Sequence, residues 1–256
     1  MLLKDKVCIV VGAASPRSIG YAVAELFAEH GAKVVAVDLA MDDQVASDIK
    51  ASIDKRTQRD SEVIGLRCDI ASASDCDKVV RETLARFGSI DCLVNSAGIV
   101  KGTPMLQISE KEYDVIVDVN LKGSFNLCKS VLNVFVERKA GVIVNLASSA
   151  AQRGGGLVGG AHYAASKGGV ISLTRTIARE FGPQGIRANV VCPAMIETSM
   201  LDGLSEAKLA DIVSAVPMQR AGTARECAGA CLFLASELSG FVTGATIDVN
   251  GGSHIH

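Results

Sequence analysis

Runs of consecutive apolar residues alternate along the chain with longer stretches in which apolar residues recur every three or four positions. The runs are short and rich in β-branched residues, as in Val7–Val11 and the first three residues of Val142–Leu146, and they lack the alternation of a strand with one solvated face. The longer stretches fit amphipathic helices, of which Ile19–Glu29 and Val79–Phe87 are each followed within two residues by a glycine. This pattern predicts an α/β fold in which a parallel sheet is covered by helices on both faces.

The same pattern recurs from one end of the chain to the other. The remaining predicted strands are Lys33–Val37, Glu62–Arg67, Ile90–Val94, Arg187–Val191 and Thr246–Val249, and the remaining predicted helices are Tyr113–Glu137 and the segment around Tyr163–Phe181. No Pro/Ser-rich linker, internal repeat or shift in composition divides the 256 residues. We therefore expect a single domain over residues 1–256.

Composition narrows the classes of function. Hydrophobic residues make up 48% of the chain and charged residues 21%, which is typical of a globular protein with a substantial core. The net charge of −2 gives no reason to expect a nucleic-acid partner, and no apolar run is long enough to cross a membrane. The N-terminal segment does not resemble a signal peptide, and the eight cysteines lie in apolar segments, as in a reduced cytoplasmic protein. Cys227 and Cys231 share a helical face, but no further cysteine or histidine completes a site, so we expect no metal.

Tyr163 and Lys167 stand four residues apart in the segment Tyr163-Ala164-Ala165-Ser166-Lys167. That spacing places the phenol and the ammonium on one helical face, one turn apart. A tyrosine titrates near ~10 in isolation, and an adjacent ammonium favours the phenolate, so the pair can exchange a proton near neutral pH. Ser148 and Ser149 precede the tyrosine, and a serine hydroxyl there can hold the oxygen of a carbonyl or alcohol substrate. Taken alone, the motif also fits an ordinary surface helix.

A turn of small residues joins the first predicted strand to the first predicted helix, between Gly12 and Gly20. Backbone N–H groups at such a helix N-terminus can bind a pyrophosphate, aided by the helix dipole. Asp38 ends the second predicted strand, where a carboxylate can accept both ribose hydroxyls of adenosine and repel a 2′-phosphate. The usual GxGxxG is absent, and Asp38 alone also fits the start of a loop. The turn, the carboxylate and the βαβ pattern together favour a dinucleotide site that prefers NAD.

The chain resembles the short-chain dehydrogenases/reductases over essentially its whole length. The resemblance rests on short motifs in the family's order: Gly12…Gly20, Asp38, Cys68-Asp69-Ile70, Asn95-Ser96-Ala97-Gly98, Asn120, Ser148-Ser149, Tyr163…Lys167 and Pro193-Ala194-Met195-Ile196-Glu197-Thr198. Each motif is weak alone, whereas the ordered set is specific. The resemblance implies a doubly wound, Rossmann-type parallel sheet with helices on both faces, NAD as the cofactor and a homotetramer as the assembly.

The resemblance also implies a catalytic tetrad. Tyr163 would exchange the proton with the substrate oxygen, and Lys167 would lower the pKa of Tyr163 and bind the nicotinamide ribose. Asn120 would hold a water that connects Lys167 to solvent, with a local helix cap as its alternative role. Ser149 would hydrogen-bond the substrate oxygen; we expect the second serine of the pair in that role, with Ser148 as the alternative.

For the cofactor, the resemblance implies contacts from residues that follow successive strands. Gly12 begins the first turn, and Ser18 and Ile19, next to Gly20, would take the place of its missing middle glycine. The other implied contacts are Asp38, Asp69 and Ile70 around the adenosine, Asn95, Ala97 and Gly98 on its ribose side, and Pro193, Ile196 and Thr198 at the nicotinamide, together with Tyr163 and Lys167.

These expectations describe an enzyme that transfers a hydride reversibly between NAD(H) and a secondary alcohol or ketone, with a polyol, sugar or hydroxy acid as the small-molecule substrate. Two alternatives remain open. One is an NADPH-dependent 3-oxoacyl-thioester reductase, which Arg17 favours and Asp38 opposes; the other is a non-catalytic dinucleotide-binding protein. The first turn also looks like that of the enoyl-thioester reductases, which normally have a longer tyrosine-to-lysine spacing.

Two segments are expected at the substrate pocket. Residues 195–216 would form part of a lid over the substrate. The run Gly154–Gly160 lengthens the loop between serine and tyrosine, and Arg153 and His162 flank it. Either side chain could swing toward a substrate, and a guanidinium there would suit a carboxylate, phosphate or sulfonate. Arg153 also fits a solvated surface arginine or a contact with another subunit.

Overall fold

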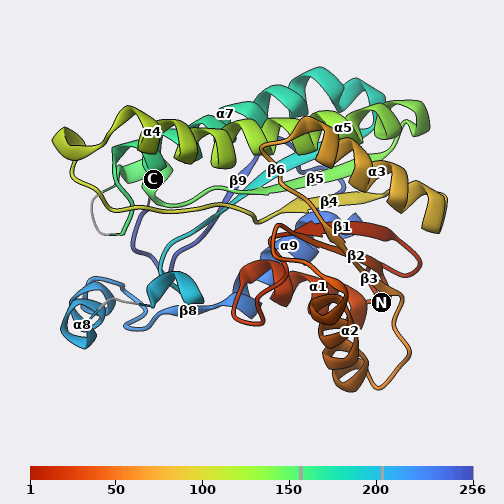
Figure 1. The fold of residues 1–256 in the computed structure, drawn as a ribbon, viewed down its shortest axis with the longest axis horizontal. Helices are drawn as coiled ribbons and strands as arrows, with labels where there is room; N and C mark the ends of the chain where they lie inside the picture. Colours follow the sequence, from red (N-terminus) through yellow and green to blue (C-terminus); the bar gives the residue numbers. More distant parts are fainter. Residues whose placement is uncertain (156–157, 203–204, 256) are drawn as a thin grey trace.

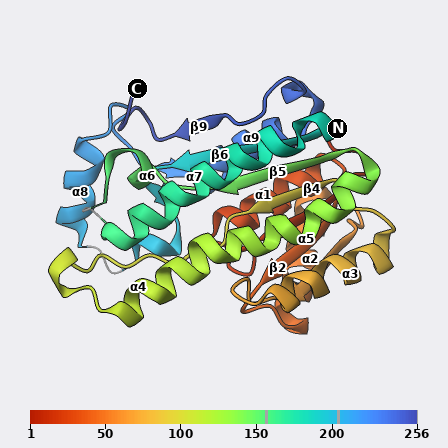
Figure 2. The same cartoon turned by 90° about the horizontal axis from the view of Figure 1, so that it is seen from above.

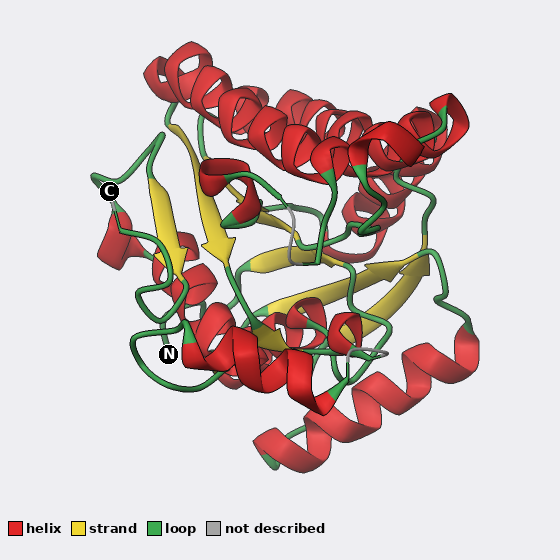
Figure 3. Cartoon of the chain, turned by 90° about the vertical axis from the view of Figure 1, so that its left-hand side faces the viewer, coloured by secondary structure: helices red, strands yellow, loops and turns green. Residues whose placement is uncertain are grey.

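A parallel sheet of seven strands lies at the centre of the molecule, with helices on both of its faces (Figures 1 and 3). The computed structural model describes residues 1–155, 158–202 and 205–255. The strands follow the order β3-β2-β1-β4-β5-β6-β9, so the chain winds outward from β1 to one edge and returns to β4 on the other side of β1. The strands are β1 (Val7–Val11), β2 (Lys33–Asp38), β3 (Val63–Arg67), β4 (Cys92–Asn95), β5 (Gly141–Leu146), β6 (Ile186–Pro193) and β9 (Thr246–Val249). The predicted doubly wound parallel sheet is confirmed.

The helices divide between the two faces of the sheet (Figures 1 and 2). One face is covered by α1 (Ile19–Glu29), α2 (Asp43–Thr57) and α9 (Ala224–Ala235). The other face is covered by α3 (Ala73–Phe87), α5 (Gly123–Arg138) and α7 (Ala161–Phe181). The shorter elements are η1 (Met105–Gln107), α4 (Glu110–Val117), η2 (Asp118–Lys122), α6 (Ala150–Arg153), η3 (Gly182–Gln184), β7 (Ile196–Glu197), η4 (Ser199–Leu201), α8 (Glu206–Ser214), β8 (Gly222–Thr223) and η5 (Glu237–Ser239).

Strand β1 is apolar throughout because both of its faces are buried. In β1, Cys8 and Val10 pack toward α1 and α9, whereas Ile9 and Val11 pack toward the helices of the opposite face. All five residues of β1 are buried. This two-sided burial explains why the strand lacks an alternation of polar and apolar residues.

Two helical segments differ from the prediction. The single helix expected over Tyr113–Glu137 is divided into α4, the π-helical turn η2 and α5. An i→i+5 turn adds one residue to the helix, and such turns are frequent at functional sites. The helix α2 was not predicted, because only Ile49 and Ile53 of its residues are buried and the rest of its surface is polar.

Two further observations concern metal binding and membrane-spanning helices. All eight cysteines are free and buried, and the described residues contain no cluster of side chains able to hold a metal ion. No helix in the described ranges is both long and apolar enough to cross a membrane.

Candidate active site

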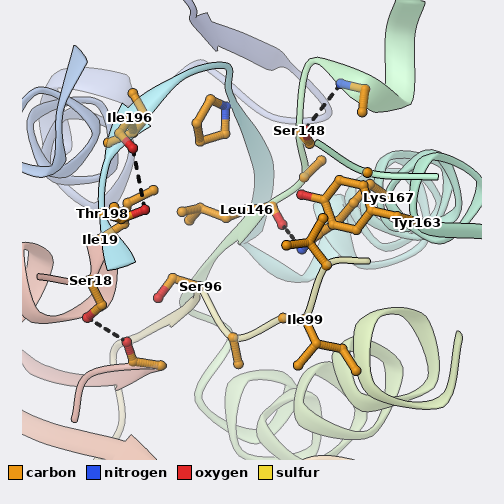
Figure 4. Close-up of a pocket in the computed structure, with 18 of the residues that line it drawn as sticks. Ser18, Ile19, Ser96, Ile99, Leu146, Ser148, Tyr163, Lys167, Ile196 and Thr198 are labelled. Atoms are coloured by element: carbon orange, nitrogen blue, oxygen red, sulfur yellow. Dashed lines mark hydrogen bonds between the residues drawn. The ribbon is translucent and has the colours of Figure 1, made fainter. Parts of the chain in front are cut away.

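A cavity of about 830 Å³ lies along the carboxyl ends of the strands (Figure 4). Its wall includes Gly12 after β1, Asp38 at the end of β2 and Ser96 after β4, and it continues to Ser148 after β5 and Pro193 at the end of β6. In doubly wound sheets, ligands bind at this edge, where the order of the strands reverses; here the reversal falls between β1 and β4. The volume lies in the upper part of the range for small-molecule sites.

The turn after β1 brings the first helix close to the sheet. Gly12 has a φ of +84°, and a methyl group on it would lie 2.9 Å from the backbone nitrogen of Ala97. A methyl group on Gly20 would lie 2.3 Å from the carbonyl oxygen of Gly12, so both ends of the turn require glycine. The hydroxyl of Ser18 donates to the carbonyl of Gly12 at 3.0 Å and accepts from the N–H of Tyr21 at 3.0 Å. Ser18 therefore caps the helix and fixes its start at the cavity wall.

The amino end of α1 has the features of a pyrophosphate site. Ile19 and Gly20 occupy its first turn, where backbone N–H groups have no acceptor within the helix. No described side chain of that turn is acidic, so the positive end of the helix dipole is not neutralised there. Ser18 and Ile19 both line the cavity. These residues fit the diphosphate of a dinucleotide.

Asp38 lies in the cavity wall with its carboxylate held by two loops. One carboxylate oxygen accepts a hydrogen bond from the N–H of Ala14, and the other accepts one from Ala40, each at 3.1 Å. A carboxylate oxygen can accept two hydrogen bonds, so both oxygens remain able to accept a hydroxyl. Asp69 and Ile70 line the same part of the cavity, as expected for residues near an adenosine.

Asn95 is not among the described residues that line the cavity, whereas Ala97 and Gly98 are. Its side chain is buried: the amide nitrogen donates to the hydroxyl of Ser124 at 2.8 Å, and the amide oxygen accepts from the N–H of Ala97 at 3.3 Å. The geometry therefore does not match the expected contact of Asn95 with a ribose. Its amide instead shapes the turn that presents Ala97 and Gly98 to the cavity.

Tyr163 and Lys167 lie one turn apart on α7, and both line the cavity. The ammonium of Lys167 donates to the carbonyl oxygen of Leu146 at 2.9 Å (Figure 4), and burial lowers the pKa of Lys167 to about 8. Burial raises the pKa of the Tyr163 phenol, and a hydrogen bond with Ser148 offsets part of that rise. The expected lowering of the tyrosine pKa by Lys167 is therefore not seen, because desolvation of the phenolate dominates. At neutral pH the phenol is protonated.

The two serines of the pair lie in different surroundings. Ser148 lies beside the ring of Tyr163 (Figure 4), where its side chain lowers the pKa of the phenol. Its hydroxyl accepts from the N–H of Ala150 at 3.2 Å. Ser149 also belongs to the cavity wall but is only 3% exposed, and its N–H donates to the carbonyl of Pro193 at 2.9 Å. The geometry favours Ser148, rather than Ser149, as the serine that shares a substrate oxygen with Tyr163.

Asn120 lies in the π-helical turn η2 and is completely buried. Its amide nitrogen donates to the carbonyl of Ile99 at 2.9 Å and to the hydroxyl of Ser166 at 3.1 Å, while its amide oxygen accepts from the N–H of Ile99 at 2.8 Å. A methyl group on Gly98 would lie 3.1 Å from that amide oxygen and 3.0 Å from the nitrogen of Lys167. Asn120 therefore lies directly behind the loop that faces the cavity, and it is not one of the described residues lining the cavity.

The cavity wall contains the residues expected at a nicotinamide and some that the sequence did not single out. Pro193, Ile196 and Thr198 line the cavity, and the hydroxyl of Thr198 donates to the carbonyl of Ile196 at 3.4 Å. Ser96, Ile99, Val119 and Leu146 line the cavity without having been predicted (Figure 4 labels Ser96, Ile99 and Leu146). Ser96 belongs to the motif Asn95-Ser96-Ala97-Gly98 after β4, and Ile99 follows that motif directly. The motif was therefore the sequence signal that could have identified both residues.

His162 faces away from the cavity, contrary to the suggestion that it might reach a substrate. Its ring is buried, and Nε2 lies 3.1 Å from a carboxylate oxygen of Glu112 on α4. The other oxygen of Glu112 accepts from Lys101. Arg153, by contrast, lines the cavity and is exposed. Residues 156 and 157 of the glycine run lie outside the described residues.

Arg17, in the first turn, makes a two-point contact with Asp202, which follows η4. The two guanidinium nitrogens donate to the two carboxylate oxygens at 3.0 and 2.8 Å. Both side chains are more than half exposed, so the pair contributes little to stability. The contact instead joins the amino end of α1 to the segment 195–216, of which residues 203 and 204 lie outside the described ranges.

Comparison with known proteins gives whole-length matches. A protein-family model described as enoyl-(acyl carrier protein) reductase matches residues 12–254. An uncharacterised short-chain type dehydrogenase/reductase of Sinorhizobium fredii is 46% identical over 257 aligned positions and is covered completely, as is this chain. The 3-oxoacyl-[acyl-carrier-protein] reductase of Escherichia coli is 35% identical over 256 residues, again with 100% of both chains covered. Among solved structures, the crystal structure of gox2181 matches with a TM-score of 0.90 and 32% identity, over 98% of this chain and 96% of that one.

Proposed function

This chain belongs to the short-chain dehydrogenase/reductase family, and we propose that it transfers a hydride reversibly between NAD(H) and a small secondary alcohol or ketone. The observation that carries the proposal is the meeting of two features in one cavity: a glycine turn fit for a dinucleotide, and the group formed by Ser148, Tyr163 and Lys167. When bound, the nicotinamide supplies or accepts the hydride, and the chain supplies orientation and acid–base groups.

The three side chains divide the work on the substrate oxygen. Tyr163, protonated at neutral pH, donates its proton to the oxygen of a ketone and takes one from an alcohol in the reverse direction. Ser148 holds the same oxygen, because it lies beside Tyr163 in the cavity wall (Figure 4). Lys167 places a positive charge close to the developing negative charge, and with a pKa of about 8 most of it is charged at neutral pH.

Asn120 contributes by positioning a loop of the cavity wall. Its amide is bonded to Ile99 and Ser166, so it fixes the loop that carries Gly98 against Lys167. Gly12 and the carboxylates of Asp38 and Asp69 would hold the adenosine half of the cofactor, and Ser18 and Ile19 would hold its diphosphate. Ile70, Ala97 and Gly98 would complete that half, whereas Pro193, Ile196 and Thr198 would hold the nicotinamide.

The cofactor preference is for NAD, because the carboxylate of Asp38 would repel a 2′-phosphate. The basic residue nearest the turn, Arg17, is engaged by Asp202. The alternative is an NADPH-dependent 3-oxoacyl-thioester reductase, which the whole-length likeness to the E. coli 3-oxoacyl-[acyl-carrier-protein] reductase favours. The family model's description names an enoyl reductase; the four-residue spacing of Tyr163 and Lys167 supports carbonyl chemistry instead.

Three further features complete the proposal. The protein is a single domain with residues 195–216 as a lid, since β7, η4 and α8 border the cavity through Ile196, Leu201 and Ile212. It is a homotetramer, an assembly that would cover exposed apolar side chains such as Phe125 on α5 and Phe241 near β9. It works in the cytoplasm, where eight free thiols stay reduced.

The test is steady-state turnover of polyols, sugars, hydroxy acids and 3-oxoacyl thioesters with NAD(H) and with NADP(H). The wild type is expected to turn over at least one hydroxy compound, and Tyr163→Phe is expected to bind NAD normally while its turnover falls about 100-fold or more. Best turnover with a thioester and NADPH would select the alternative. Binding of NAD without any turnover would instead indicate a non-catalytic dinucleotide-binding protein.

A further inference from the structure

The charged residues that line the cavity are distributed unevenly along it. Asp38 and Asp69 lie at the end formed by β2 and β3, and Lys167 lies near the middle with its ammonium on the carbonyl of Leu146. At the other end, where α6, the glycine run and the lid segment meet, Arg153 is the only charged residue among the described ones that line the wall. This end therefore carries a positive charge and no negative one.

The backbone holds Arg153 close to the reacting groups. The helix α6 is a single turn that begins directly after Ser149, and the N–H of Arg153 donates back to the carbonyl of Ser149 at 3.1 Å. On its other side the chain enters the glycine run, which returns to the catalytic tyrosine: a methyl group on Gly159 would lie 2.2 Å from Cδ1 of Tyr163. Both chain connections of Arg153 thus lead directly to the residues that hold the substrate oxygen.

The guanidinium of Arg153 has no hydrogen bond or ion pair with another described residue. Two other arginines differ in this respect: Arg17 is paired with Asp202, and Arg220 is paired with Glu226. An arginine at a cavity wall with its fork unused can bind a planar anion through two parallel hydrogen bonds.

Apart from the hydroxyls of Thr198 and Ser199, the side chains that the glycine run and the lid segment contribute to the cavity wall are apolar. Val158, Leu201 and Ile212 are among them, and none of these three can bond a sugar hydroxyl through its side chain. A polyol would leave several hydroxyls against these side chains without partners, which costs free energy for each buried polar group. A short hydrocarbon with one hydroxyl and one anionic end would leave no such hydroxyls without partners.

We propose that Arg153 binds an anionic group of the substrate, so that the substrate is a short hydroxy or oxo compound carrying a carboxylate, sulfonate or phosphate. This inference rests on the proposed function, because it takes Tyr163 and Ser148 as the point that holds the reacting oxygen. The anion belongs either to the substrate itself or to a phosphate of a coenzyme A carrier, and the chemistry at Arg153 is the same in both cases.

The experiment compares matched substrates in matched variants. Initial rates with NAD are measured for 3-hydroxybutyrate, lactate and 2,3-dihydroxypropanesulfonate, and for the methyl esters of the two carboxylates. The carrier source is tested with 3-hydroxybutyryl-coenzyme A against the corresponding pantetheine thioester. The variants are Arg153→Gln, which removes the charge, Arg153→Lys, which keeps the charge but loses the fork, and Arg179→Gln. Arg179 is an exposed residue of α7 outside the cavity wall, so its variant controls for net charge.

In Arg153→Gln, kcat/KM for the anionic substrate is expected to fall about tenfold or more, mainly through KM, while the neutral partner changes less than twofold. Arg153→Lys should fall between wild type and Arg153→Gln, and Arg179→Gln should match wild type. A fall confined to coenzyme A thioesters assigns the anion to the carrier. Equal falls for charged and neutral partners, or no fall at all, overturn the proposal.

A second readout separates this inference from the proposed reaction. Binding of acetoacetate, pyruvate and 3-hydroxypropanesulfonate to the protein with NAD(H) is measured by calorimetry, which requires no turnover. Binding that depends on Arg153 in a protein that turns over no alcohol would contradict the proposed reaction and support the arginine site. Turnover of neutral alcohols without any Arg153-dependent binding of these anions would support the reaction and overturn the arginine site.

Discussion

Replacing Asn120 by alanine tests how much its amide, held in the π-helical turn, stabilises the native structure. In the structure the amide makes three hydrogen bonds, two with the backbone of Ile99 and one with Ser166. Ser166 keeps another partner, because its hydroxyl donates to the carbonyl of Tyr163 at 2.8 Å. The N–H and C=O of Ile99 lose theirs, and each unpaired group costs about 1–3 kcal/mol. We therefore expect Asn120→Ala to lower the free energy of unfolding by about 2–5 kcal/mol, a large share of the ~5–15 kcal/mol typical of a native protein.

The assay is urea-induced unfolding of wild type and variants at one protein concentration, with the free energy of unfolding taken by linear extrapolation. Asn250→Ala is the matched control: its amide also bonds backbone groups, those of Gly252 and His254, but near the C-terminus of the chain. We expect the control to lose no more than about 1 kcal/mol. Asn120→Asp should be no better than alanine, since it places a carboxylate oxygen against the carbonyl of Ile99. A loss below about 1 kcal/mol in Asn120→Ala would show that the loop does not depend on this amide.

Four further predictions follow from the geometry of the site. Ser148→Ala should reduce kcat/KM about tenfold or more and Ser149→Ala much less, and the reverse order in steady-state assays would restore the sequence-based choice of Ser149. Asp38→Ala should lower the ratio of kcat/KM with NAD to that with NADP, because both the repulsion of a 2′-phosphate and the ribose hydrogen bonds are lost; an unchanged ratio would place the selectivity elsewhere. Gly20→Ala should weaken NAD binding about tenfold or more in calorimetry, since its methyl group would lie 2.3 Å from the carbonyl of Gly12; normal affinity would mean that the turn yields without cost. Burial lowers the pKa of Lys167 from 10.5 to about 8, so between pH 8 and pH 10.5 the unfolded chain binds more protons than the native one. The free energy of unfolding of wild type, relative to that of Lys167→Met, should therefore rise by about 1.4 kcal/mol per pH unit over this range. A difference that does not change with pH in unfolding experiments would contradict the burial of the ammonium.

The strands and most of the cavity wall could be predicted from the sequence because their signals are local. A strand buried on both faces is mostly apolar, so β1 and β5 were predicted within one residue of their observed bounds. Glycines such as Gly12 and Gly20 mark close approaches of the backbone, and such positions can be read from residue type. The helix α2 was missed because its buried face consists of only Ile49 and Ile53.

The sequence predicted the polar contacts within the site less well, because it does not show which partner each polar group meets. Asn95 has the residue type of a ligand-binding amide, but both ends of its amide are bonded inside the protein. The neighbouring serines Ser148 and Ser149 differ only in the direction that the loop gives them, and the sequence does not fix that direction. The guanidinium of Arg17 was a candidate for contact with a phosphate, but in the structure it is hydrogen-bonded to Asp202, 185 residues away in the sequence. Such pairings arise from tertiary structure, which no local pattern contains.

The strand order has an evolutionary consequence. Because the chain reverses at β4, the segment up to β3 supplies the wall around Asp38 and Asp69, while the acid–base groups all come from β5 and the elements after it. The residues proposed to select the nucleotide and those proposed to act on the substrate therefore lie in consecutive parts of the chain, before and after β4. A single recombination event near the codons for β4 could join an adenosine half from one relative to a reacting half from another. The contacts between α1 and α9 and the Arg17–Asp202 pair are the places where such a hybrid would have to match.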